Sequence, residues 1–112
     1  MAQVSSEVTS QALDSVRVLR RYCDVARAYL FGSHVWGISD ECSDIDVAAF
    51  VKDLESWDLR REIGITVAVQ RETGDRVELH LFPASLLPNP EPASFSELIL
   101  HKGILIDDSS ES

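Results

Sequence analysis

Apolar side chains near the start of the chain recur every three or four positions, which is the spacing of one face of an α-helix. The positions are Val8, Ala12, Val16, Leu19 and Cys23. This spacing predicts a helix over residues 6–25, with Cys23 on its apolar face. The run AYLF at residues 28–31, which Gly32 ends, predicts a short strand after that helix.

Two later segments alternate apolar and polar side chains, as a strand with two different faces does. In SDIDVAAFVK, residues 43–52, one side carries Ile45, Val47, Ala49 and Val51, and the other carries Asp44, Asp46, Ala48 and Phe50. In VELHLF, residues 77–82, the alternation continues until Pro83 stops it. Both segments are predicted to be strands.

The segment of residues 56–72 fits two patterns. Its apolar positions Trp57, Leu59, Ile63 and Val67 fit a helix, whereas ITVAV alone suits a strand, and we favour the helix. After a proline-rich connector, residues 95–102 fit a final helix that ends at Gly103, and the apolar run ILI follows. This order of elements predicts an α/β (α+β) fold, in which helices pack on a small mixed β-sheet.

The composition restricts the class of protein. The 112 residues are 45% hydrophobic and 26% charged, which suits a single domain over residues 1–112 with a flexible acidic tail, DDSSES, at residues 107–112. Lys and Arg number 10 against 19 Asp and Glu, so the formal net charge is -9. A general nucleic-acid binder is not expected, because binding phosphates requires clustered basic residues that this composition lacks.

Hydropathy and cysteine usage predict a reduced, cytoplasmic protein that does not enter a membrane. No apolar run approaches the ~20 residues that span a bilayer, and the N-terminal segment lacks the pattern of an export signal. Cys23 and Cys42 do not have the spacing of a structural metal site. In a reducing compartment they are most simply free thiols, with Cys42 in a loop.

Acidic side chains on two predicted strands form the candidate chemistry. Asp44 and Asp46 stand two apart on one strand and point the same way, and Glu78 on another strand can join them. Such a cluster persists if it is protonated, hydrated or bound to a cation, and carboxylate oxygens suit Mg²⁺ or Mn²⁺. At the end of the first strand, the backbone N–H groups and hydroxyl of Gly32 and Ser33 could hold phosphate oxygens.

Each of these residues also has a structural interpretation. The three acids could simply form the solvent faces of their strands. Ser33 could cap a short helix, a role that is compatible with phosphate binding. His34 and His80 are more simply structural histidines, although either could contact phosphate or take part in proton transfer.

The segment LFGSHVWGISDECSDIDVAAFV, residues 30–51, resembles the signature of the polymerase-β-type nucleotidyltransferase superfamily. In that signature Gly-Ser precedes Asp-x-Asp in a strand, and ten residues separate the two motifs here. The single small domain, and the later order of strand, helix and apolar segment, are similar to the minimal nucleotidyltransferases. Those proteins are the partners of HEPN-domain proteins in bacterial and archaeal toxin–antitoxin modules.

The resemblance implies a polymerase-β-like nucleotidyltransferase fold, a reaction and a role for each site residue. Gly32 and Ser33 would bind the β and γ phosphates of ATP. Asp44 and Asp46 would hold two Mg²⁺ ions as catalytic metal ligands, and Glu78 would complete that metal site. The chain would transfer AMP to a hydroxyl of a HEPN-type toxin, for example that of a Tyr, and would thereby act as the antitoxin.

Two departures from the family pattern keep other interpretations open. Family members often carry Arg after Gly-Ser, where this chain has His34, Val35 and Trp36, so weaker nucleotide binding is expected. The third acid is commonly Asp, and Glu78 is one methylene longer. A module that neutralises its partner by contact alone stays an alternative. So does a small-molecule nucleotidyltransferase, although that class normally needs an added domain for its acceptor. A homodimer, or a complex with the partner, is expected for so small a core.

Overall fold

The helices and strands follow one another much as the hydrophobic pattern predicts. The computed structural model describes residues 5–36 and 44–109, except for the side chains of Ser33 and Trp36. Its elements are α1 (Ser6–Leu19), β1 (Val25–Phe31), α2 (Ser33–Trp36), β2 (Ile45–Val51), α3 (Leu59–Thr73), β3 (Val77–Pro83), α4 (Phe95–Lys102) and β4 (Ile104–Asp108). Short 3₁₀ helices, Leu54–Ser56 and Ala84–Leu86, follow β2 and β3. The predicted α/β fold, a small mixed sheet with helices packed on it, is confirmed.

Within the described residues, the strands form a 4-stranded mixed sheet in the order β3-β2-β1-β4. β1 runs antiparallel to β2 and to β4, whereas β2 and β3 are parallel. A parallel pair needs a crossover connection, and α3 supplies it between β2 and β3. β1 and β2 are therefore the central strands. Each of them has a neighbouring strand on both sides.

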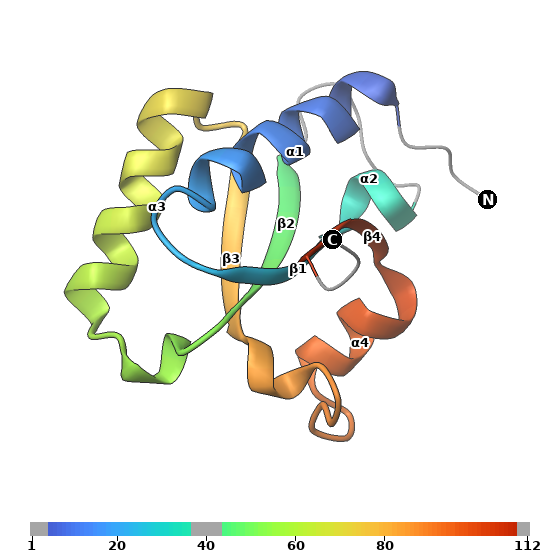
Figure 1. The fold of residues 1–112 in the computed structure, drawn as a ribbon. Helices are drawn as coiled ribbons and strands as arrows, with labels where there is room; N and C mark the ends of the chain where they lie inside the picture. Colours follow the sequence, from blue (N-terminus) through green and yellow to red (C-terminus); the bar gives the residue numbers. More distant parts are fainter. Residues whose placement is uncertain (1–4, 37–43, 110–112) are drawn as a thin grey trace.

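The two faces of the sheet are covered by different helices (Figure 1). One face packs against α1 and α3 and carries the fully buried side chains of Ile45, Val47, Ala49 and Val51. On the other face, Ala48 and Phe50 lie in a second apolar cluster with Ile99 of α4. The predicted two-sided character of β2 is confirmed, but both of its sides are covered by apolar packing along most of the strand.

Side-chain caps begin α1, α3 and α4. The N-cap residues Ser5, Asp58 and Ser94 accept hydrogen bonds from backbone N–H groups of the first turn, at 3.2, 2.8 and 3.1 Å. These caps satisfy N–H groups that have no partner within the helix, and each contributes about 1 kcal/mol. The cap at Asp58 starts α3, so the favoured helix is confirmed for the ambiguous segment, but it begins at Leu59.

α1 ends at Leu19, earlier than the predicted residue 25. The prediction that Cys23 lies on a helix face is wrong, because Cys23 lies in the bend that precedes β1. At this point sheet pairing competes with the helix: Val25 pairs with Val51, and the Lys52 N–H donates to the Asp24 carbonyl at 2.9 Å. The helical spacing of apolar residues could not reveal that competition, since the strand partners are distant in sequence.

α3 buries a different face from the one that its apolar spacing indicates. Leu59, Ile63 and Val67 are 70%, 52% and 38% exposed. Val69 is instead the buried residue of this helix, and Ile65 packs beside it against the core of α1 and the sheet. The periodicity therefore predicted the type of element correctly and its buried face incorrectly.

The acidic residues at the C-terminal end belong to the sheet. Asp107 and Asp108 lie in β4, which pairs with β1. Arg20 Nε lies 2.8 Å from Asp107 Oδ2, and Arg27 Nε lies 3.3 Å from Asp108 Oδ2. The prediction of a flexible tail from residue 107 is wrong for these two residues, because strand pairing and ion pairs hold them. Residues 110–112 lie outside the described part of the chain.

Hydropathy and cysteine chemistry add two further facts. Among the helices of the described residues, none is both long enough and apolar enough to cross a membrane. Cys23 is a partly buried free thiol, and this burial raises its pKa to about 11. Cys42 lies outside the described residues.

Candidate functional site

The sheet register brings a glycine and two carboxylates to one end of the central strands. Phe31, the last residue of β1, pairs with Asp46 near the start of β2. Asp46 in turn lies opposite Glu78 on β3. Residues directly opposite on neighbouring strands share a face of the sheet, so the two carboxylates point to the same side. Gly32, which follows Phe31, ends the strand beside Asp46.

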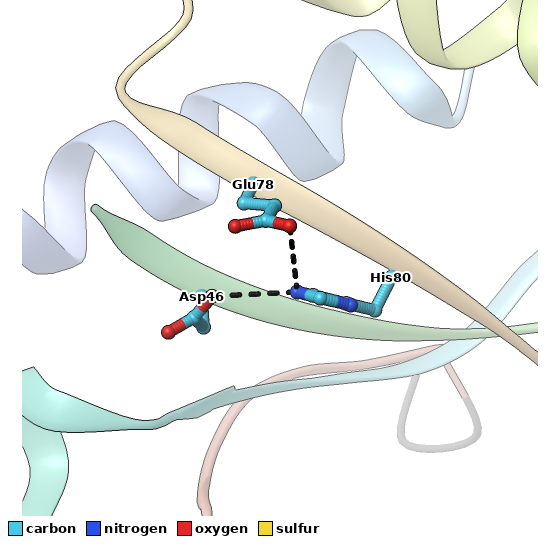
Figure 2. A group of neighbouring side chains, drawn as sticks. All are labelled: Asp46, Glu78 and His80. Atoms are coloured by element: carbon cyan, nitrogen blue, oxygen red, sulfur yellow. Dashed lines mark hydrogen bonds and ion pairs between the residues drawn. The ribbon is translucent and has the colours of Figure 1, made fainter.

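His80 joins the two acids on this face. It stands two residues after Glu78 on β3, and side chains two apart on a strand point the same way. Its Nε2 lies 3.3 Å from Asp46 Oδ1 and 3.9 Å from Glu78 Oε1 (Figure 2). One donor atom from each residue lies within 4.8 Å of the other two. We call Asp46, Glu78 and His80 the acid–imidazole cluster.

The acid–imidazole cluster is open to solvent. The side chains of Asp46, His80 and Glu78 are 23%, 31% and 57% exposed. Two carboxylates on neighbouring strands repel each other, and water on the open side screens that repulsion. A cation or a charged ligand can therefore reach all three groups without a change of fold.

Gly32 lies so close to Asp46 that no side chain fits between them. Its φ of +84° is in the left-handed region that favours glycine, and an added Cβ would overlap Asp46 Oδ2. The Gly32 carbonyl accepts a hydrogen bond from the Val35 N–H at 3.0 Å, which starts the short helix α2. The backbone at Gly-Ser thus runs directly past the carboxylate, and a phosphate bound to this backbone would lie beside any cation held by Asp46.

Aromatic side chains pack against the core side of the acid–imidazole cluster. Phe31 is 4% exposed, and its ring centroid lies 5.1 Å from that of His80 in an edge-to-face arrangement. The same Phe31 ring lies 5.3 Å from Phe95 of α4. Edge-to-face pairs of this kind favour one ring orientation. His80 is therefore held with its Nε2 toward the carboxylates, and the cluster lies directly against the buried core residue Phe31.

The structure brings together some of the residues predicted from the sequence and not others. Asp46, Glu78 and Gly32 lie together at one end of the sheet. Asp44 immediately precedes β2, is exposed, and is not a member of the cluster. The backbone of Ser33 begins α2, and its hydroxyl lies outside what the structure describes. Catalytic and metal-binding roles for Asp44, Asp46 and Glu78 remain predictions.

His80 lies in the cluster although the sequence did not place it in the candidate site. A signal for it was present, because Glu78 and His80 are separated by one residue and so share a strand face. What the sequence did not contain was the pairing of β3 with β2, which places this face beside Asp46. Without that register, the residues that neighbour His80 on other strands cannot be identified.

The donor set of the acid–imidazole cluster fits a divalent cation. Adjacent ligands about 2.1 Å from a cation in an octahedral shell lie roughly 3 Å apart. The separations of 3.3 and 3.9 Å from His80 Nε2 to the two carboxylates approach that spacing. A bound cation would offset the repulsion between Asp46 and Glu78.

Comparison with known proteins identifies the family and agrees with the fold. Residues 15–112 match the family described as "Polymerase beta, Nucleotidyltransferase", so the chain belongs to that nucleotidyltransferase family. The fold is similar to the crystal structure of a candidate nucleotidyltransferase from Sulfolobus solfataricus, with a TM-score of 0.68 and 15% sequence identity. That similarity covers 95% of this chain and 85% of the other, and at this identity it concerns the fold. No curated protein matches the chain.

Proposed function

We propose that the chain transfers AMP from ATP to a hydroxyl of a partner protein, in a reaction that requires Mg²⁺ or a related divalent cation. The proposed partner is a HEPN-type toxin, for which the chain would be the cytoplasmic antitoxin. The observation that carries the proposal is the acid–imidazole cluster beside Gly32. A cation site and a close-approach glycine, side by side, are what a nucleoside triphosphate with its metal requires.

In this proposal the carboxylates bind the metal ions, and the backbone at Gly-Ser binds the phosphates. Asp46 and Glu78 would hold a cation, and Asp44, which immediately precedes β2, is the proposed ligand of a second. Bound cations would neutralise the triphosphate, lower the pKa of the attacking hydroxyl and stabilise the departing pyrophosphate. The backbone at Gly32 and Ser33 would hold the β and γ phosphates, because the absent side chain at Gly32 allows them to approach closely.

The surface next to the cluster supports a protein as the acceptor. Phe95 and Leu98 of α4 are 48% and 41% exposed, and they line an open, mainly apolar cavity of about 630 Å³. The buried ring of Phe31 contacts both Phe95 and His80, and so it connects this apolar surface to the cluster. Exposed apolar surface next to a reactive site is typical of protein-binding surfaces. The net charge of -9 would speed encounter with a basic, RNA-binding toxin.

A label-transfer assay tests the proposal. The chain is incubated with Mg²⁺, ATP labelled at the α-phosphate and a candidate HEPN-domain protein, and label on that protein is measured. Transfer is expected for the unmodified chain and should fall at least ~100-fold in Asp46→Asn, because the carboxylate holds the cation. Asp53→Asn is the matched control, since Asp53 lies beyond the other end of β2. Equal transfer by both variants would contradict the proposal.

A contact-only binding module is the second candidate, and one observation favours it. Asp44 is not part of the acid–imidazole cluster, so the structure does not assemble all three predicted acids. Under this alternative, the Asp44→Asn, Asp46→Asn double variant would still neutralise the toxin when the two are co-expressed. Under the catalytic proposal, the double variant would bind the toxin yet fail to protect the cells.

A further inference from the structure

His80 is placed as a metal ligand would be. Its Nε2 is the ring atom nearest to both carboxylates of the cluster, at 3.3 Å from Asp46 and 3.9 Å from Glu78 (Figure 2). The ring is fixed from the core side by its edge-to-face contact with Phe31. The side chain is 31% exposed, so the nitrogen is neither sealed in the core nor free in solvent.

The chemistry of the donors distinguishes this cluster from an all-oxygen site. Mg²⁺ prefers oxygen ligands and retains several waters, whereas an imidazole nitrogen is a good ligand for first-row transition-metal ions. Two carboxylates and one imidazole therefore favour a divalent transition-metal ion that also accepts oxygen ligands, such as Mn²⁺, over Mg²⁺. For coordination, Nε2 must present its lone pair to the ion, so the ring proton would reside on Nδ1.

We propose that His80 Nε2 binds the same divalent cation as Asp46 and Glu78, and that this nitrogen makes the site prefer Mn²⁺ over Mg²⁺. This inference rests on the cation site of the proposed function and specifies its composition. The other role open to His80 is a hydrogen bond to Asp46 Oδ1 that positions the carboxylate without touching the ion. In that case His80 would affect both cations alike.

Electron paramagnetic resonance of the unmodified, metal-free chain with Mn²⁺ alone tests the coordination directly. Electron spin-echo modulation detects a ¹⁴N nucleus bonded to Mn²⁺, and a directly bonded imidazole nitrogen is expected. This measurement needs no variant and no catalytic activity. Bound Mn²⁺ with only oxygen and water ligands would overturn the inference while leaving the cation site intact.

Competition between the two cations tests the preference. Mn²⁺ affinity is measured from the signal of the free ion, and Mg²⁺ affinity from its displacement of bound Mn²⁺. His80→Gln should weaken Mn²⁺ binding by at least ~10-fold, because loss of even an indirect partner of a metal ligand often costs that much. Mg²⁺ binding should change much less, so the ratio of the two affinities falls. His101→Gln, on the exposed side of α4, is the matched control and should leave the ratio unchanged.

The outcomes separate this inference from the proposed function. If Asp46→Asn abolishes Mn²⁺ binding and His80→Gln leaves the Mn²⁺ to Mg²⁺ ratio unchanged, the cation site stands and the role of His80 is refuted. If the unmodified chain binds neither cation, both proposals fail. A circular-dichroism melt of His80→Gln, with His80→Asn as a second variant, shows that any loss of affinity arises in a folded protein.

Discussion

The two faces of β2 differ in what they carry: one face is buried against helices along its whole length, and the other includes a residue of the candidate site. On the side of α1 and α3, Ile45 and its partners at every second position are fully buried. On the side of α4, Ala48 and Phe50 are also fully buried, but Asp46 is 23% exposed. The difference between Asp46 and Phe50, which share a face, arises because the apolar cluster around α4 includes Phe50 and not Asp46.

The candidate site lies at the end of β2 that the apolar cluster around α4 does not cover. Charged side chains at a covered position would lose their hydration, whereas at an uncovered strand end they keep it and still have neighbours from β1 and β3. Pairing with both neighbours holds the carboxylate of Asp46 in a defined position. An ordered but hydrated carboxylate is the combination that cation binding requires.

The largest expected effect is a difference in stability between variants of two adjacent residues, whose side chains lie on opposite faces of β2. Ile45→Ala removes a fully buried side chain and should lower the free energy of unfolding by about 2–5 kcal/mol. Asp46→Asn, one residue away, should shift the melting temperature by no more than about 4 °C while it abolishes cation binding. Urea unfolding and Mn²⁺ titration of both variants measure the two effects. A large loss of stability in Asp46→Asn would show that the open face also supports the fold.

A smaller effect is expected from substitution of two glycines with similar, positive φ values. Gly32 and Gly74 have φ values of +84° and +91°, so alanine at either position should cost about 1–3 kcal/mol through backbone strain. An added Cβ meets Asp46 at Gly32, whereas it meets nothing within 4 Å at Gly74. Gly32→Ala should therefore also displace the carboxylate and weaken Mn²⁺ binding by at least ~10-fold. Gly74→Ala should leave Mn²⁺ binding unchanged, and the same weakening in both variants would contradict this account.

The smallest effect concerns Cys23, just before β1 begins at the end of the sheet away from the acid–imidazole cluster. Burial raises the pKa of the Cys23 thiol from 9.0 to about 11, so the reactive thiolate is scarce at pH 8. In a Cys42→Ser background, alkylation by iodoacetamide should be slower in the folded chain than in urea. The alkylation rate of the folded chain should keep rising above pH 9. A rate equal to that of the unfolded chain at pH 8 would show that this end of the sheet is open too.

The same pKa shift predicts how stability depends on pH. Between pH 9 and about 11, the unfolded thiol loses a proton that the folded thiol retains. The unfolded state binds fewer protons in this window, so the Cys23 contribution to the free energy of unfolding falls as pH rises. Urea titrations at pH 8.5 and 10.5 measure the decrease, which should be smaller in Cys23→Ser.

Local periodicity was sufficient for most of the fold. The alternation in SDIDVAAFVK and VELHLF predicted β2 and β3, and both are confirmed. It failed where distant parts of the chain compete for the same residues. The helix predicted to residue 25 ends at Leu19 because β1 pairs with β2, and Asp107 lies in a strand because β1 offers it a partner.

Residue types that are close together along the chain were enough to predict most of the elements, the Gly-Ser and Asp-x-Asp motifs and the acidic composition. Three features depend on contacts between distant segments: Glu78 and His80 lie beside Asp46, Asp44 does not join them, and Gly32 approaches the Asp46 carboxylate closely. These contacts follow from strand register. Register is set by the packing of whole faces against α1, α3 and α4, which no local pattern in the sequence encodes.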